Sequence, residues 1–182
     1  NPANFCNLVG IRPSVGRVPS WPEQLGWYTM SVAGPMARTV EDLALAMSVM
    51  SGPDDRSPIA LDTPGSIFTT PLQRQFKGCK VAYSEDLGGL PIEPEVRKVM
   101  QASRGVFEKL GCEVVDDVID LSEAGEIFML WRAWRTELRI SPLMKEHRNQ
   151  LKDTVIWNAE QGLDLTGPQL ARAEAKRTEI YH

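Results

Sequence analysis

Few residues of this chain have the types and spacing that enzyme chemistry usually requires. The sequence contains two histidines, His147 and His182, so neither a Ser-His-Asp triad nor a metal site built on histidine is expected. Ser14 and Ser31 have no base close to them in the sequence that could activate either hydroxyl as a nucleophile. The glycine pair at 88–89 is not followed by Lys-Ser/Thr, so an ordinary turn is expected there instead of a phosphate-binding loop. The residues therefore predict no metal and no cofactor.

Aromatic side chains are better candidates for a binding site. Trp131 and Trp134 lie at helical spacing on one face of a predicted helix, and Trp27 and Tyr28 lie in a long loop. We interpret these four residues as possible contacts for a small substrate, because pockets for small molecules are lined mainly by apolar and aromatic side chains. The alternative for the two helical tryptophans is packing in the core, where large aromatic side chains contribute much buried area.

Composition and charge exclude several classes of partner. The net charge is −4 and no block of Lys or Arg could follow a phosphate backbone, so no nucleic acid is expected. No apolar run approaches the roughly 20 residues needed to cross a bilayer, so no membrane segment is expected. Cys6, Cys79 and Cys112 are widely spaced and odd in number, which indicates small buried hydrophobic residues in a reducing cytoplasm. The sequence predicts a cytoplasmic protein.

The first part of the chain is predicted to contain a strand, a long loop and a helix. Residues 4–10 are mostly apolar and suggest a buried strand, whereas residues 11–36 interleave aromatic residues with Pro and Gly, as a well-packed loop does. Thr39 is the expected N-cap of a helix that ends at Gly52. The prolines of residues 53–76 indicate an extended crossover.

A strand, a helix and a second strand are predicted next. The strands span residues 79–83 and 113–115, and the helix begins at Pro94, in a position where a missing N–H is tolerated. Short connections imply that the strands pair in parallel with a right-handed crossover. The helix carries an apolar stripe formed by Val96, Val99, Met100, Ser103, Phe107 and Leu110.

Helices are predicted for most of the remaining chain. One spans residues 122–140 and is broken or kinked by Pro142. Residues 143–160 are also interpreted as helical, and Thr166 begins a last helix. The predicted fold class is therefore α/β, with helices packed on a mixed β-sheet.

Three stretches make the chain resemble the amidase signature family. Residues 1–18 are similar to a family pattern that reads small-Pro-Ala-x-x-Cys-Gly, two hydrophobic residues, then Gly-Leu-Lys-Pro-Thr-x-Gly-Arg-Val. Residues 34–44 read Gly-Pro-Met-Ala-Arg-Thr-Val-Glu-Asp-Leu-Ala and resemble a second family stretch, in the expected order and separation. Residues 51–58 resemble the Gly-x-Asp-x-x-Asp link that follows it. The resemblance covers essentially the whole chain.

The resemblance implies an α/β/α sandwich that is truncated at both ends. We expect residues 1–182 to form a single incomplete amidase domain. Its parts would be the end of the signature core (1–52), a crossover loop (53–75) and the strand-helix-strand unit with further helices (76–182). Because such a sheet would lack strands, its open edges should pair with another chain. The expected partners are a second copy or the remainder of a parent chain, besides a small amide substrate.

The chemistry that the resemblance implies is hydrolysis of an amide to a carboxylate and ammonia by a Ser-Ser-Lys triad. One Ser attacks the carbonyl, a second Ser in a cis peptide bond relays the proton to a neutral Lys, and backbone N–H groups stabilise the oxyanion. In the family these three residues precede the position of Asn1. We therefore assign no catalytic residue within the chain, and we expect the isolated chain to be inactive.

Two departures from the family pattern affect the choice among family functions. Asn7 replaces the frequent Gly after Cys6, and residues 29–33 lack the Ser-Leu-Asp-Gln of many glutaminyl-tRNA amidotransferase A subunits. A stand-alone amidase is therefore favoured over such a component. A non-catalytic α/β scaffold or binding module is a further alternative. Arg38 could contact substrate, or it could pair with a carboxylate and support its loop.

Overall fold

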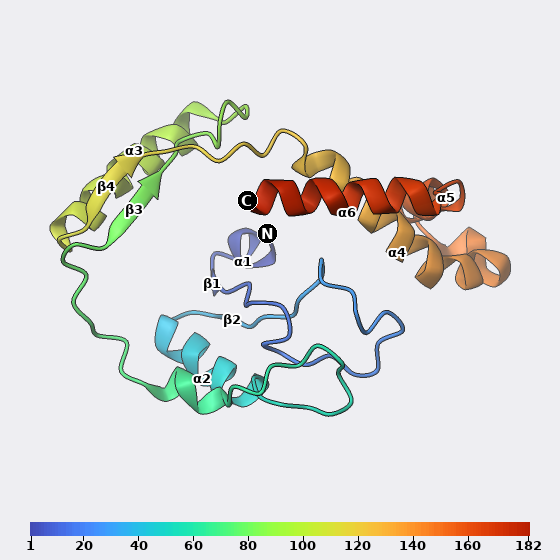
Figure 1. The fold of residues 1–182 in the computed structure, drawn as a ribbon, viewed down its shortest axis with the longest axis horizontal. Coiled ribbons are helices and arrows are strands. Elements are labelled where there is room, and N and C mark those ends of the chain that lie inside the picture. The colour runs from blue at the N-terminus through green and yellow to red at the C-terminus, as the bar shows by residue number, and fades with distance from the viewer. The chain divides into compact units, whose positions relative to one another are not determined.

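A computed structural model describes all residues from 1 to 182, and they form two compact units, residues 1–74 and 75–182. Figure 1 shows their helices and strands along the chain. The boundary falls at the end of the expected crossover loop, 53–75, and each unit is described by itself below. The assignment of the chain to a single incomplete domain stays a prediction.

The first unit is built around one capped helix. Its elements are α1 (Pro2–Phe5), β1 (Val9–Gly10), β2 (Met36–Ala37), α2 (Val40–Met50) and the 3-10 helix η1 (Gly65–Thr69). The hydroxyl of Thr39 accepts a hydrogen bond from the backbone N–H of Asp42 at 3.1 Å, so the predicted N-cap is confirmed. Leu43 and Met47 of α2 are buried, as the apolar face of this helix predicts.

The strand predicted over residues 4–10 is wrong for most of its length. The chain forms the short helix α1, with Pro2 in its first turn, and only Val9 and Gly10 are extended. The backbone N–H groups of Phe5 and Cys6 donate to the carbonyls one turn earlier, both at 3.1 Å, and Asn7 then adopts a positive φ of 53°. The apolar side chains are not buried, since Phe5 is 88% exposed and Cys6 is exposed too. The prediction of three buried cysteines is therefore also wrong.

The second unit begins with the predicted strand-helix-strand arrangement. It consists of β3 (Lys80–Tyr83), α3 (Pro94–Lys109) and β4 (Glu113–Asp116), and the strands pair in parallel with Lys80 opposite Glu113. Gly111 follows α3 with a φ of 85°, a conformation that side chains rarely adopt. With β1 and β2 antiparallel and β3 and β4 parallel, both strand orientations occur, and the predicted α/β class is confirmed.

Helices form the rest of the second unit. They are α4 (Ala124–His147), the 3-10 helix η2 (Arg148–Gln150), α5 (Asp153–Leu163) and α6 (Gly167–Tyr181). In Figure 1, α4, α5 and α6 lie together, and α4 contacts both of the other helices. The hydroxyl of Thr166 accepts from the backbone N–H of Gln169, so the predicted start of the last helix is confirmed. None of the helices is long and apolar enough to span a membrane.

The predicted break at Pro142 does not occur, because α4 continues through this residue to His147. A proline inside a helix removes one backbone hydrogen bond. Packing offsets that loss here, since Ile127 and Ala133 of α4 are buried. The hydroxyl of Ser141 also donates to the carboxylate of Glu137 at 2.8 Å, one turn earlier. The helical segment predicted over 143–160 is interrupted by η2.

Candidate functional site

Two of the three stretches that carry the resemblance pair with each other. β1 comes from residues 1–18 and β2 from residues 34–44, and they form an antiparallel pair with Val9 opposite Ala37. The backbone N–H of Ile11 extends the pairing by donating to the carbonyl of Pro35 at 3.4 Å. Stretches that are separated in the sequence therefore form one local structure.

Glycines make this local structure possible by allowing close backbone approaches. A Cβ on Gly10 would lie 2.6 Å from the Cβ of Ala3, and one on Gly34 would lie 2.1 Å from the carbonyl oxygen of Ile11. Both distances are far below a normal van der Waals contact. The short helix α1 is thus held directly against β1, and the start of β2 against the residue that follows β1.

The long loop between β1 and β2 is packed, as predicted. Gly16 has a φ of 76°, and its carbonyl accepts from the backbone N–H of Leu61 at 2.9 Å. The hydroxyl of Ser57, which is buried, accepts from the backbone N–H of Ser20 at 3.5 Å. The loop after β1 is therefore tied to the loop after α2, within the same unit.

The predicted aromatic residues Trp27 and Tyr28 lie at the surface of this loop. The side chain of Trp27 is 75% exposed, whereas Tyr28 is half-buried and its N–H donates to the carbonyl of Leu25 at 2.9 Å. An exposed tryptophan is available to a ligand. Contact of Trp27 and Tyr28 with substrate stays a prediction.

The predicted pair Trp131 and Trp134 is brought together in α4 of the second unit. Their rings meet edge to face, with centroids 5.3 Å apart, and both side chains are half-buried. Between them in the sequence, Ala133 is buried, and a Cβ on Gly162 of α5 would lie 2.5 Å from its carbonyl oxygen. The pair thus lies on the helix that packs against α5, which fits the alternative of core packing. Its contact with substrate also stays a prediction.

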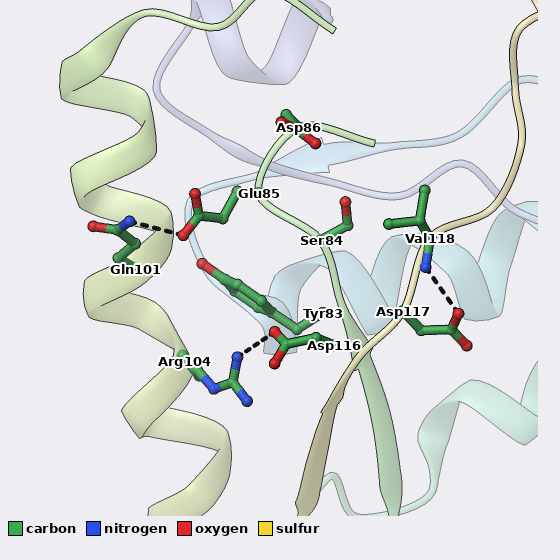
Figure 2. A pocket seen from close by; sticks show the side chains of 9 residues that line it. All are labelled: Tyr83, Ser84, Glu85, Asp86, Gln101, Arg104, Asp116, Asp117 and Val118. Carbon is green, nitrogen blue, oxygen red and sulfur yellow. Dashed lines mark hydrogen bonds and ion pairs between the residues drawn. The ribbon is translucent and has the colours of Figure 1, made fainter. Parts of the chain in front are cut away.

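A hollow at the carboxyl ends of β3 and β4 was not predicted. It has a volume of about 600 Å³ and is open to solvent. Its lining residues are Tyr83, Ser84, Glu85, Asp86, Gln101, Arg104, Asp116, Asp117 and Val118, which Figure 2 shows. The hollow lies at the edge of a parallel sheet where ligands bind in many α/β proteins.

Charged side chains in this hollow connect α3 to both strand ends. Glu85 accepts from Arg97 at 2.7 Å and from Gln101 at 2.8 Å, and Asp116 accepts from Arg104 at 2.5 Å. The hydrogen bond that the guanidinium of Arg104 donates to Asp116 is the main reason why the pKa of Arg104 is raised. The guanidinium of Arg104 also lies 5.1 Å from the centre of the Tyr83 ring. These contacts satisfy the charges within the unit, so the cluster holds α3 in place.

The glycine pair at 88–89 and Arg38, which were also considered from the sequence, lie in a turn and at the end of β2. Asp86 accepts from the backbone N–H groups of Gly88 and Gly89 at 3.2 and 3.1 Å, so the expected turn is confirmed. Arg38 is exposed at the end of β2, and no carboxylate pairs with it. No group of His, Cys, Asp and Glu residues is arranged to hold a metal ion.

Comparisons with known proteins agree on one family. The family model described as "Amidase" matches residues 1–172. The chain is similar to an acylamidase of Rhodococcus erythropolis, with 27% identity over 183 aligned residues that cover 99% of this chain. It is also similar to the A subunit of a glutamyl-tRNA(Gln) amidotransferase of Synechococcus sp., with 33% identity over 124 residues and 68% of this chain. The chain spans 38% and 26% of these two relatives.

Solved structures show the same fold. A bacterial aryl acylamidase of the amidase signature enzymes superposes with a TM-score of 0.84 and 27% identity, over 97% of this chain and 39% of its own. A 6-aminohexanoate cyclic dimer hydrolase superposes with a TM-score of 0.71 over 98% of this chain and 40% of its own. The second structure is only 17% identical and supports the fold alone.

Proposed function

The chain belongs to the amidase family, and on this premise we propose that it is part of an enzyme that hydrolyses a carboxamide to a carboxylate and ammonia. The observation that carries the proposal is the family match over residues 1–172, which includes the paired strands β1 and β2. The acylamidase relatives support it, because they are similar to this chain over nearly all of its length. We further propose a cytoplasmic enzyme for a small amide, with a second copy or further residues of a longer chain as partner.

The proposed mechanism uses a Ser nucleophile, a second Ser in a cis peptide bond and a neutral Lys. We place all three outside residues 1–182. This placement is supported by the similarity of residues 1–18 to the stretch that follows the nucleophile in the family. Ser14 and Ser31 offer no substitute, since both are exposed and neither hydroxyl hydrogen-bonds to a base.

The role that we propose for the first unit is to hold the backbone next to the nucleophile. A nucleophile must stay within a few tenths of an ångström of its productive position, which requires rigid neighbours. The close contact of Gly10 with Ala3 and the pairing of β1 with β2 supply such neighbours. The proposal assigns this unit a supporting function, with no chemical step of its own.

Trp27, Tyr28, Trp131 and Trp134 are the side chains that we propose to contact substrate. The test replaces Trp27 by Ala in the natural protein that contains this chain. Because Trp27 is exposed, folding should be unchanged, and KM for an aryl amide should rise about tenfold if the ring contacts the substrate. Trp21→Ala is the matched control, since Trp21 is also exposed and was not assigned to the site. Equal effects of the two substitutions, or no effect of either, would refute the assignment of Trp27.

A component of a tRNA-dependent amidotransferase is the second candidate function. It is supported by the higher identity of the amidotransferase relatives, but these cover 62–68% of the chain, against 99% for the acylamidase. The experiment assays the natural protein for hydrolysis of simple anilides and for transamidation of glutamyl-tRNA. Hydrolysis without transamidation is the expected result. Transamidation would instead establish the amidotransferase role. Absence of both activities would favour a non-catalytic scaffold or binding module.

A further inference from the structure

Two of the three cysteines lie next to each other at the start of the parallel strands, which Figure 1 shows side by side. Cys79 directly precedes β3 and Cys112 directly precedes β4. In the register of this pair Lys80 lies opposite Glu113, so one residue earlier Cys79 lies opposite Cys112. Both thiols are free in this structure. The fold thus brings together two reactive groups that are widely spaced in the sequence.

Backbone hydrogen bonds on both sides hold the two cysteines next to each other. The N–H of Glu113 donates to the carbonyl of Cys79 at 2.9 Å, and the N–H of Gly78 donates to the carbonyl of Gly111 at 2.9 Å. Paired strands lie about 4.8 Å apart. A disulfide requires Cα atoms that are between about 4.4 and 6.8 Å apart. The backbone therefore needs no large movement for a disulfide to form here.

The two cysteine side chains share one face of the strand pair. Val81 and Val114, which lie opposite each other, are half-buried, and alternation along the strands places both cysteines on the same face as these valines. Cys79 and Cys112 are half-buried too. The carbonyl of Phe76 accepts from the backbone N–H of Cys79 at 3.0 Å and from the thiol of Cys112 at 3.8 Å. One carbonyl therefore contacts both cysteines.

We propose that Cys79 and Cys112 are an oxidation site, at which a peroxide converts the two thiols into a reversible intrachain disulfide. The thiolate of one cysteine takes an oxygen from the peroxide and becomes a sulfenic acid, and the other peroxide oxygen leaves as hydroxide. The second thiol then attacks the sulfenic sulfur, forms the S–S bond and releases water. Overall, the two thiols lose two protons and two electrons, and the peroxide is reduced to two molecules of water.

The position of the pair favours a bond that is easily reduced. The Cβ atoms of opposite residues in a parallel pair lie about as far apart as the strands, at about 4.8 Å, whereas those of an unstrained disulfide lie about 3.8 Å apart. Strained disulfides are reduced more readily than unstrained ones. The pair should therefore be open under reducing conditions and close on oxidation. The proposal does not rest on amide hydrolysis, because neither cysteine is assigned to that reaction.

The first test maps disulfides in the natural protein that contains this chain. The reduced protein is treated with hydrogen peroxide in dilute solution, the remaining thiols are alkylated, and trypsin is added without reductant. The expected product joins the peptides 78–80 and 110–132, which hold the two cysteines, and dithiothreitol separates them again. Under non-reducing conditions the oxidised protein should still migrate as a single chain. Cys6→Ser should leave the product unchanged, whereas Cys112→Ser should abolish it.

The second test measures whether the two thiols react with each other faster than with a reagent from solution. Dimedone traps sulfenic acids, and a neighbouring thiol competes with this trapping. Cys79→Ser and Cys112→Ser each remove the competing thiol. In at least one of these variants the remaining cysteine should carry about ten times more dimedone adduct than in the unchanged protein, because a reaction between neighbouring groups has a high effective concentration. Cys6→Ser should not raise the adduct at either position.

Recovery of both cysteines as separately alkylated peptides after peroxide treatment would overturn the proposal, because adjacent thiols should couple. A disulfide from either of them to a different cysteine would overturn it as well. Equal amounts of dimedone adduct in the unchanged protein and in both serine variants would show that the two thiols are not neighbours. The peptide map of the unchanged protein needs no substitution, so it decides the proposal even where a variant fails to fold.

Discussion

At the scale of single residues, the first unit depends on glycines that no other residue can replace. Gly16 shows this most clearly, because its backbone has a positive φ and a Cβ would lie 1.8 Å from the carbonyl oxygen of Ile59. Both the strain and the overlap act against any side chain. The backbone hydrogen bond that joins the loop after β1 to the loop after α2 therefore depends on Gly16.

Gly16→Ala is expected to destabilise the chain by about 1–3 kcal/mol, from backbone strain together with displacement of residue 59. The measurement is chemical denaturation of the two proteins. Gly105→Ala is the control, since nothing lies within 4 Å of its Cβ position in α3. Alanine is the better helix former, so this variant should be stabilised by about 0.5–1 kcal/mol. Equal effects of the two variants would show that the contact with Ile59 is wrong.

The ion pair of Asp54 and Arg56 gives a prediction about pH. The side chain of Arg56 donates two hydrogen bonds to the carboxylate, at 2.9 and 2.7 Å, and its backbone N–H donates a third at 3.0 Å. They lower the pKa of Asp54 from 3.8 to about 2. Because the pKa is lowered on folding, the stabilisation is present above pH 3.8 and is lost as the pH falls toward 2.

Titration of the Asp54 carboxyl carbon by NMR measures this directly. Arg56→Ala should return the pKa of Asp54 toward its ordinary value, because it removes the side-chain bonds that are the largest cause. Arg74→Ala, elsewhere in the same unit, should not. An unchanged pKa of Asp54 in Arg56→Ala would contradict the assignment.

At the scale of elements, α4 is the helix whose sequence and structure disagree most. Pro142 lies inside the helix, where proline is about 3 kcal/mol less favourable than alanine. The helix continues because it packs against α5 and α6. Long-range packing therefore outweighs a local signal.

Pro142→Ala should stabilise the chain by up to about 3 kcal/mol, because it restores a backbone donor inside α4. Thermal and chemical denaturation measure the change. Pro94→Ala is the matched control, since Pro94 is in the first turn of α3, where proline is tolerated, and should change little. A destabilised Pro142→Ala variant would mean that the ring makes contacts worth more than the missing hydrogen bond.

Elements with strong local signals were predictable from the sequence. The caps at Thr39 and Thr166 and the parallel pairing around α3 needed only short-range information. The helix α1 was missed because four residues are too few for a periodic pattern to distinguish a helical turn from a strand. The hollow at the ends of β3 and β4 was missed because it depends on side chains that follow the two strands and on side chains of α3, and the strand pairing alone does not predict that they lie close together. Its signal was present in Arg97, Gln101 and Arg104, which share the polar side of α3.

At the scale of the whole molecule, the family match and the fold both indicate a part of an amidase. The chain has the amidase fold over nearly all of its length. Our account is that the chain supports and completes a site whose Ser, Ser and Lys lie outside residues 1–182.

The most direct measurement is intact-mass spectrometry after treatment with a fluorophosphonate, a reagent that reacts covalently with activated serines. The account predicts that the 182-residue chain stays unlabelled, while the natural protein that contains it gains one adduct on a serine outside these residues and loses amidase activity. Stoichiometric labelling of a serine within the chain, such as Ser14 or Ser31, together with amide hydrolysis by the chain alone, would contradict it.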